Sequence, residues 1–205
     1  MASVLAGFRP VKHLTGAPYN GQVNRYMTPA GDAQALNVGD LVTLAAATES
    51  IVDPVTGGVF PAVIRAATTA VVAIVGSVVG FEPDYSNLNA SNVRLASTRR
   101  VVLVADSPDL IFAAPQSGAV GSQIAAASVG LNVTLVTGTA STTGNVASTQ
   151  QVSSGSVTTT STSPLKLVGI TASPDNNDLT STAARSAEVL VMINTHQYAP
   201  SVARV

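Results

Sequence analysis

Apolar stretches of strand length, bounded by glycine, proline, asparagine or aspartate, recur along most of the chain and predict β-strands. The predicted strands cover residues 41–44, 59–65, 70–81, 100–105, 110–113, 131–136, 165–171 and 188–194. The stretch 70–81 is apolar on both faces, which indicates a strand buried on both sides or covered on one side by a partner. One short helix is predicted over residues 123–128, with Ser122 as its N-cap. The pattern therefore predicts a mainly β fold with at most one short helix.

The first 31 residues have neither the strand period nor the helix period. Three prolines exclude a regular helix, and no acidic residue occurs before Asp32. We expect an extended N-terminal arm over residues 1–31, a β-body over residues 32–198 and a C-terminal tail over residues 199–205; a loose terminus is the alternative for the arm. Aromatic and arginine side chains dominate binding hot spots, and the candidate contact residues of the arm are Phe8, Arg9, Lys12, Tyr19, Arg25 and Tyr26.

The middle of the chain lacks charge. Residues 110–165 contain no acidic or basic side chain, and residues 137–163 consist mostly of serine, threonine, glycine, valine, glutamine and alanine. This tract is predicted to form either a loop or edge strands. An open, uncharged strand edge promotes aggregation, so we expect the tract to be paired or packed against a neighbouring subunit. A homodimer or homotrimer of closed symmetry would provide that cover.

Composition excludes several classes of partner. Of the 205 residues only 10% are charged, compared with about 25% in an average soluble domain, and the formal net charge is −1. Without an excess of lysine and arginine the chain is not expected to bind nucleic acid, and the absence of tryptophan argues against a stacking platform for single strands. The longest uncharged apolar stretch, between Arg65 and Glu82, is shorter than the roughly 20 residues of a spanning helix, so no membrane partner is expected.

Motifs of catalytic or cofactor-binding chemistry are not found. The sequence has no phosphate-binding glycine loop, no nucleophile elbow and no cysteine. His13 and His196 lie at opposite ends of the chain, and a zinc site would need two further ligands. The carboxylate pairs at positions 82 and 84, 106 and 109, and 175 and 178 lie in turn-like sequences, where aspartate bonds to nearby backbone. We therefore predict no catalytic residue, no cofactor site and no metal site, and we expect a protein that is not an enzyme.

Several short blocks carry a resemblance to a known class of protein. They include GFRP at residues 7–10, PYNG at 18–21, NRY at 24–26 and INTHQY at 193–198. With these blocks the chain resembles, over most of its length, the capsid decoration (cement) proteins of tailed bacteriophages, especially those of short-tailed phages. The Ser/Thr-rich tract at residues 137–163 matches this pattern least well.

The resemblance implies a β-barrel or jelly-roll-like body that binds the outer surface of a phage capsid and stabilises the head. It implies the major capsid protein as partner, dimers or trimers at local symmetry axes, no cofactor, and a location on the virion exterior after synthesis in the cytoplasm of the host bacterium. One alternative is another virion subunit, from a tail or a fibre. A second alternative, a secreted carbohydrate-binding β-sandwich module, is less well supported because tryptophan is absent.

Overall fold

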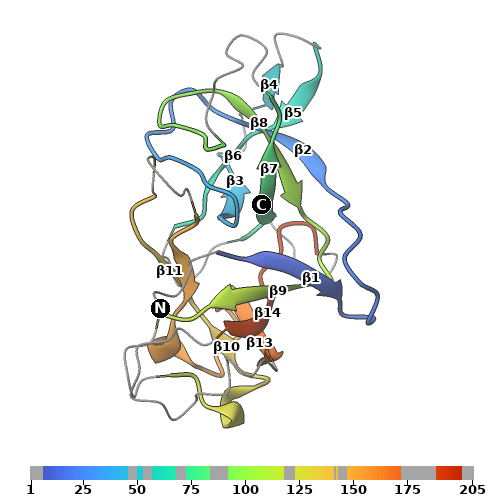
Figure 1. Ribbon diagram of the computed structural model, residues 1–205, viewed down its shortest axis with the longest axis vertical. Helices are drawn as coiled ribbons and strands as arrows, with labels where there is room; N and C mark the ends of the chain where they lie inside the picture. The colour runs from blue at the N-terminus through green and yellow to red at the C-terminus, as the bar shows by residue number, and fades with distance from the viewer. Residues whose placement is uncertain are drawn as a thin grey trace.

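The computed structural model describes residues 7–45, 50–52, 57–67, 73–83, 92–117, 123–140, 142, 147–171 and 188–199. These residues form antiparallel β-sheets and two short 3₁₀ helices, so the predicted mainly β fold class is confirmed. The predicted helix over 123–128 is shorter than expected: only Ala126–Ser128 (η1) is helical, and Ser122 lies outside the described residues. Figure 1 shows one five-stranded sheet in the lower half of the molecule and a second in the upper half.

Sheet I, in the lower half, joins strands from both ends of the chain. Its order is β1-β9-β14-β13-β10, and every neighbouring pair is antiparallel. Its strands are β1 (Arg9–His13), β9 (Leu110–Pro115), β14 (Glu188–Ile193), β13 (Leu165–Ile170) and β10 (Asn132–Val133). Because β14 lies between β9 and β13, the sheet is complete only when residues far apart in sequence have met.

Sheet II, in the upper half, has the order β2-β8-β7-β3-β6. Its strands are β2 (Asn24–Thr28), β8 (Arg100–Ala105), β7 (Gly76–Phe81), β3 (Leu41–Leu44) and β6 (Val63–Arg65). A hairpin of β4 (Ser50–Val52) and β5 (Val59–Pro61) lies at its end. The predicted strand over 59–65 is thus divided at Ala62 into β5 and β6.

The expectation of a closed barrel is not met in the part of the chain that the structure describes, because neither sheet closes on itself there. The outer strands of sheet II come together through a single parallel bridge between Met27 and Ala62. Pro29 follows β2 and Pro61 precedes Ala62. Proline has no N–H to donate, so each of the two segments lacks a backbone donor that could extend this bridge into a ladder.

The main hydrophobic core contains side chains of both sheets. In sheet I it includes one face of β9, β14 and β13, with Phe112 opposite Val191 and Val191 opposite Leu167. Sheet II contributes Leu41 and Ala105. Burial of each large aliphatic or aromatic side chain contributes roughly 1.5–3 kcal/mol, so this shared core holds the two sheets together. Two smaller clusters lie within sheet II and beneath the β4–β5 hairpin.

The described part of the N-terminal segment is extended, as expected, but it is built into the body of the chain. β1 pairs with β9 in sheet I, and β2 pairs with β8 in sheet II. The predicted boundary at residue 31 therefore does not separate an arm from the sheets. The sequence pattern did not predict β1, because an irregularity between Pro10 and Lys12 interrupts the two-residue period.

The Ser/Thr-rich tract is paired within its own chain at several of its described positions. β12 (Gln150–Val152) pairs with β11 (Leu135–Thr137), and Thr158 forms a bridge with Asn132. A second 3₁₀ helix, η2, covers Ser154–Ser156. The predicted need for pairing is therefore met here by the chain itself and does not require a neighbouring subunit.

Gly76, the first residue of β7, lies where two strands approach closely. This close approach predicts that a larger side chain at position 76 destabilises the fold. A Cβ atom at position 76 would overlap the carbonyl group of Ala105. We expect Gly76→Ala to lower the free energy of unfolding by about 1–3 kcal/mol, as overpacking does in other cores. Gly80→Ala, in the same strand, is the control, because its Cβ would lie 3.9 Å from the nearest side-chain atom, Leu103 Cδ1. Urea denaturation measures both; equal stabilities of the two variants would contradict the prediction.

Candidate interaction surface

Two of the six predicted contact residues belong to the core. Phe8 is 0% exposed and lies in the main core, and its N–H donates to the carbonyl of Gly39 at 2.8 Å. Tyr26 is 4% exposed and lies in the cluster within sheet II. Neither side chain is available to another protein, so the prediction that they are docking anchors is wrong. An aromatic residue in an extended segment can equally mark a strand with one buried face.

Tyr26 also anchors a polar cluster at the turn between β8 and β9. Its hydroxyl donates to Asp106 Oδ2 at 2.5 Å, and Asn24 Nδ2 donates to both carboxylate oxygens at 3.0 Å. Burial, followed by the hydrogen bond to Asp106, raises the pKa of Tyr26. Nearby, the half-buried Tyr19 donates its hydroxyl to the carbonyl of Gln22 at 3.1 Å. This cluster fixes the chain between β1 and β2 against the β8–β9 turn.

The two arginines among the candidate contact residues have acidic partners. Arg9 forms an ion pair with Glu188 of β14. Arg25 Nη2 lies 2.6 Å from Glu82 Oε2, and the Arg25 guanidinium lies 4.8 Å from the centre of the Phe60 ring. Lys12 is exposed like both arginines, but the described residues include no ion-pair partner for it.

Lys12 belongs to a row of side chains on the outer face of sheet I. The strand register places Lys12 opposite Ile111, Ile111 opposite Met192, and Met192 opposite Lys166. Directly opposed residues of antiparallel strands project from the same face. A second row on this face contains Arg9, Ala113, Leu190 and Gly169. We call these eight positions the lysine face.

Lys166 was not among the predicted contact residues, although the sequence contains a signal for it. Its neighbours Leu165 and Leu167 are both buried in the main core. Since side chains alternate along a strand, Lys166 must point away from that core. What the sequence could not show is the register that brings Lys166 and Lys12 to one face from opposite ends of the chain.

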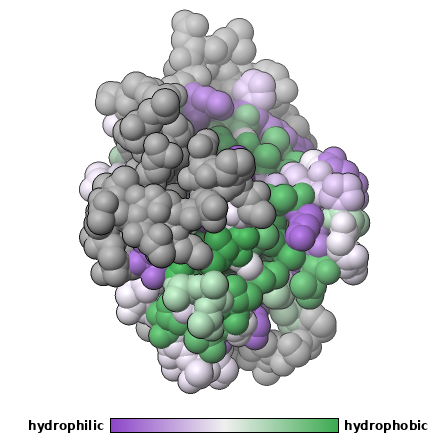
Figure 2. Space-filling view, turned by 60° about the horizontal axis from the view of Figure 1, so that its bottom comes forward, coloured by the Kyte–Doolittle hydropathy of each residue, from purple (hydrophilic) through white to green (hydrophobic). Residues whose placement is uncertain are grey.

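Hydrophobic residues gather over the end of the molecule that contains sheet I. Figure 2, which brings the lower end of Figure 1 forward, shows them as a continuous area with hydrophilic residues at its margin. Leu190 and Met192 of the lysine face are partly exposed, as is Val129 beyond η1 at 43%. This end of the molecule therefore combines apolar side chains with few charges, a composition suited to contact with another protein.

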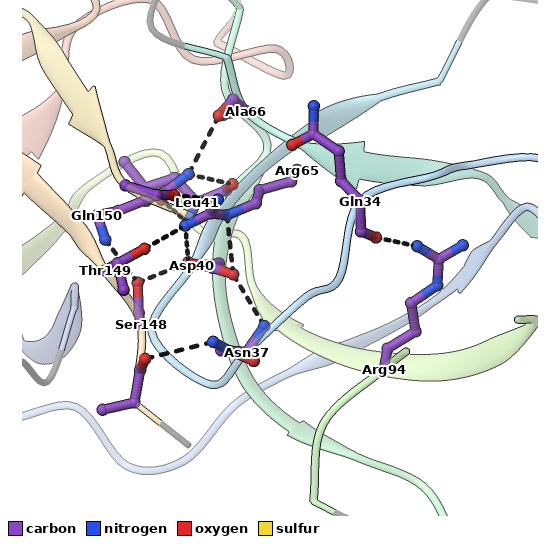
Figure 3. A network of polar contacts seen from close by, with 12 residues as sticks. Gln34, Asn37, Asp40, Leu41, Arg65, Ala66, Arg94, Ser148, Thr149 and Gln150 are labelled. Atoms are coloured by element: carbon purple, nitrogen blue, oxygen red, sulfur yellow. Dashed lines mark hydrogen bonds and ion pairs between the residues drawn. The ribbon is translucent and has the colours of Figure 1, made fainter. Parts of the chain in front are cut away.

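A buried polar network ties the Ser/Thr-rich tract to sheet II, as Figure 3 shows. Asp40, which precedes β3, is fully buried, and its carboxylate lies 3.1 Å from Arg65 Nε and 3.2 Å from Arg65 Nη2. Ser148 Oγ donates to Asp40 Oδ1 at 2.6 Å, and the Asn37 N–H donates to Oδ2 at 2.8 Å. Arg65 also donates to Thr149 Oγ1 at 2.9 Å. Burial raises the pKa of Asp40, while Arg65 and Ser148 oppose that shift.

Gln150 extends the network through backbone groups. Its Oε1 accepts from the Leu41 N–H at 2.5 Å, and its Nε2 donates to the Ala66 carbonyl at 3.1 Å. The side chain thus takes the place of a backbone partner at β3 and at the residue after β6. Because these groups bond to one another inside the molecule, the network serves to position segments and offers no reactive group to a substrate.

Arg94 forms a second internal clamp. Its side chain is fully buried, and its guanidinium donates to Asp32 Oδ2 at 2.9 Å, to the Pro29 carbonyl at 2.7 Å and to the Gln34 carbonyl. Arg94 Nε donates to the Thr98 carbonyl at 2.8 Å. From its residue type alone, Arg94 would be placed on the surface. Its guanidinium instead holds the loop after β2 in place.

Serine, aspartate and histidine meet at the β8–β9 turn, but in an order that does not activate a nucleophile. Ser107 Oγ donates to Asp109 Oδ1, and the same oxygen lies 3.1 Å from His13 Nδ1. In a catalytic triad the histidine lies between the serine and the carboxylate and takes the serine proton, whereas here the aspartate lies between them. The hydrogen bond from Ser107, followed by that from His13, lowers the pKa of Asp109. The contacts of Asp109 with Ser107 and His13 therefore hold the β8–β9 turn in place.

The remaining candidate ligands do not converge in the described part of the chain. His13 lies beside Asp109, whereas His196 is buried and accepts at Nδ1 from the Tyr198 N–H at 3.1 Å. Among the residues that the structure describes, no group of three histidine, cysteine or acidic side chains could hold a metal ion. Two of the predicted carboxylate pairs cannot be placed, because the described residues do not include Asp84, Asp175 or Asp178.

Comparison with known proteins adds no relative. No model of a protein family matches the chain, and neither a curated protein nor a solved structure matches it. In the part of the chain that the structure describes, no helix has the length and apolar composition that crossing a membrane requires.

Proposed function

We propose that this chain is a structural virion protein that binds the outer surface of a tailed-phage capsid as a decoration protein and stabilises the head. The resemblance of its short sequence blocks to decoration proteins suggests this role. The major capsid protein is the proposed partner, and the proposed location is the virion exterior, after synthesis in the cytoplasm of the host bacterium. A dimer or trimer of the chain is the proposed bound form.

The observation that carries the proposal is the character of the surface. Few charges cover it, and its exposed apolar side chains include a directly opposed pair. Val52 and Val59 lie directly opposite each other in the β4–β5 hairpin and are 55% and 63% exposed. Val11 and Leu14, in and just after β1, are 44% and 56% exposed. Isolated surface valines need no explanation, but grouped ones support burial against another protein.

The buried polar clusters also support a binding role. Asp40 with Arg65, and Arg94 with Asp32, fix loops and strands within the molecule. A surface that is rigid before binding loses less conformational entropy when it docks. These four charged side chains therefore contribute to a preformed shape, which favours binding to a shell.

The test is binding to heads assembled without this protein, from the phage whose genome encodes the chain. We expect the purified protein to co-sediment with these heads at a fixed stoichiometry and to raise the temperature at which they release DNA. Heads that already carry the protein are the control and should take up none. If the protein fails to bind, and instead forms rings or filaments by electron microscopy, a tail or fibre subunit replaces a decoration protein as the better assignment.

A surface hollow supports a sugar-binding module as the second candidate function. A surface hollow of about 510 Å³ is lined by Gln22, Val23, Asn24, Asp106, Ser107 and Pro108. Carboxylate, amide and hydroxyl groups in one hollow are the donors and acceptors that sugar hydroxyls use. Binding to a glycan array without binding to heads would favour this candidate over a decoration protein.

A further inference from the structure

We propose that the lysine face of sheet I is the surface that docks on the capsid, and that its partner is an apolar patch of the shell bordered by acidic side chains. This inference rests on the proposed function and specifies which face is used and which chemistry it meets. Three observations carry it: the alignment of both lysines in one row, the apolar strip between them and the sign of the local charge.

The first observation is the alignment of the lysines. Lys12 and Lys166 are the only lysines in the chain, and they lie in the same cross-strand row, with Ile111 and Met192 between them. Neighbouring strands lie about 4.8 Å apart, so the backbones at the two lysines are separated by roughly 14 Å. Two cations therefore border one apolar strip on opposite sides.

The second observation is the strip itself. Ile111 and Ala113 are buried, but neither belongs to any of the three hydrophobic clusters of the interior. They form the floor of the strip, and the partly exposed Leu190 and Met192 stand beside them on β14. Because the face is carried on a multistranded sheet, it offers a broad and fixed surface, unlike a loop that must be ordered on binding.

The third observation is the sign of the charge. Arg9 and Glu188 form an ion pair on this face, which leaves the two lysines as its excess charge. When Glu188 is counted with the eight positions, this face carries a formal charge of +2 in a chain whose net charge is −1, so all other residues together carry −3. The described residues provide no ion-pair partner for either lysine. Complementary charge selects the correct partner and speeds its encounter, so an acidic border on the shell fits this face.

The same charge disfavours a second copy as the occupant. A two-fold dimer apposes the same patch of both subunits, which would gather four lysines in one interface. Like charges placed together oppose association. A different protein with acidic side chains around an apolar centre fits the face better.

The small number of lysines permits a direct test by chemical footprinting. An amine-acylating reagent modifies lysine side chains, so both sites report on this face alone, and mass spectrometry measures the rate at each. We expect Lys12 and Lys166 to react at least about tenfold more slowly when the protein is bound to undecorated heads than when it is free. If the protein binds heads while both lysines keep their free reactivity, the docking face is elsewhere, and the proposed function stands without it.

Charge-reversal variants provide the second measurement. Lys12→Glu and Lys166→Glu should each weaken head binding by about tenfold or more at low salt, with unchanged thermal unfolding. Arg99→Glu is the matched control, because Arg99 is exposed, lies outside the lysine face and undergoes the same change of charge; its binding should remain within about twofold. Equal binding by all three variants would overturn the inference.

Two further outcomes separate this inference from its alternatives. If wild-type protein does not bind heads, both the proposed function and the docking face are rejected. If the free protein shows loss of lysine reactivity that increases with its own concentration, a second copy covers the face, and the acidic shell patch is rejected as its partner.

Discussion

Replacing Phe8 with alanine should lower the free energy of unfolding by about 3–5 kcal/mol, the range measured when a buried phenylalanine is truncated. Phe8 is fully buried in the core shared by the two sheets, and its carbonyl accepts a hydrogen bond from Ser77 Oγ at 2.6 Å. The cavity left by its ring would lie where sheet I meets sheet II. Urea denaturation of the purified variant measures the loss.

Val11→Ala provides the control for Phe8→Ala, because Val11 lies in β1 but is 44% exposed. We expect it to change the free energy of unfolding by less than about 1 kcal/mol, as most surface substitutions do. Removal of residues 1–26 should have a still larger effect than Phe8→Ala, since it deletes β1 and most of β2, and should abolish cooperative unfolding. A truncated protein that retains its thermal transition would show that the segment is an independent arm.

Breaking the buried ion pair between Asp40 and Arg65 should cost about 3–5 kcal/mol for either single variant, Asp40→Asn or Arg65→Met. Asp40 and Arg65 side chains are 0% and 4% exposed. Loss of one partner leaves the other as an uncompensated charge away from water, which is the most costly outcome for such a pair. The double variant removes both charges, so its loss should be smaller than the sum of the single losses.

A double-mutant cycle in urea measures the coupling between Asp40 and Arg65. Arg25 and Glu82 serve as the comparison pair, because their side chains are 39% and 25% exposed. Pairs this accessible to solvent contribute about 0–1 kcal/mol. If the buried pair shows no more coupling than Arg25 and Glu82, the ion pair at the centre of the network in Figure 3 does not stabilise the fold.

Strands with a regular apolar pattern were predictable from local sequence. Residues 41–44 and 100–105 form β3 and β8 with the predicted bounds, and the predicted strand 188–194 corresponds to β14 with one residue fewer. In each case turn-forming residues at the ends and apolar side chains between them specify a strand without reference to the rest of the fold.

Features set by distant contacts were not predictable from local sequence. β1 and β2 have charged or polar residues at most exposed positions, and what makes them strands is pairing with the distant strands β9 and β8. Asp40 follows a glycine and has the local signature of a turn aspartate. Its burial depends on Arg65 and Ser148, whose proximity is a property of the tertiary structure.

The lysine face was likewise only partly predictable from local sequence. Lys12 was identified from its segment, and the outward direction of Lys166 follows from the alternation around it. Their common row depends on the register of three strand pairs, which a single sequence does not reveal. Phe8 and Tyr26 were misassigned because an aromatic side chain serves a core and an interface equally well.

The position of β14 has a consequence for how the molecule is made. This strand lies between β9 and β13, and the ion pair on its edge joins residues 179 positions apart. On the ribosome, β1 and β9 are synthesised long before β14, so the centre of sheet I stays open until residues 188–193 emerge. Such non-local β topologies fold in roughly milliseconds to seconds, and the incomplete sheet exposes strand edges during synthesis. The lysine face on sheet I is therefore formed only after residues 188–193 have been made.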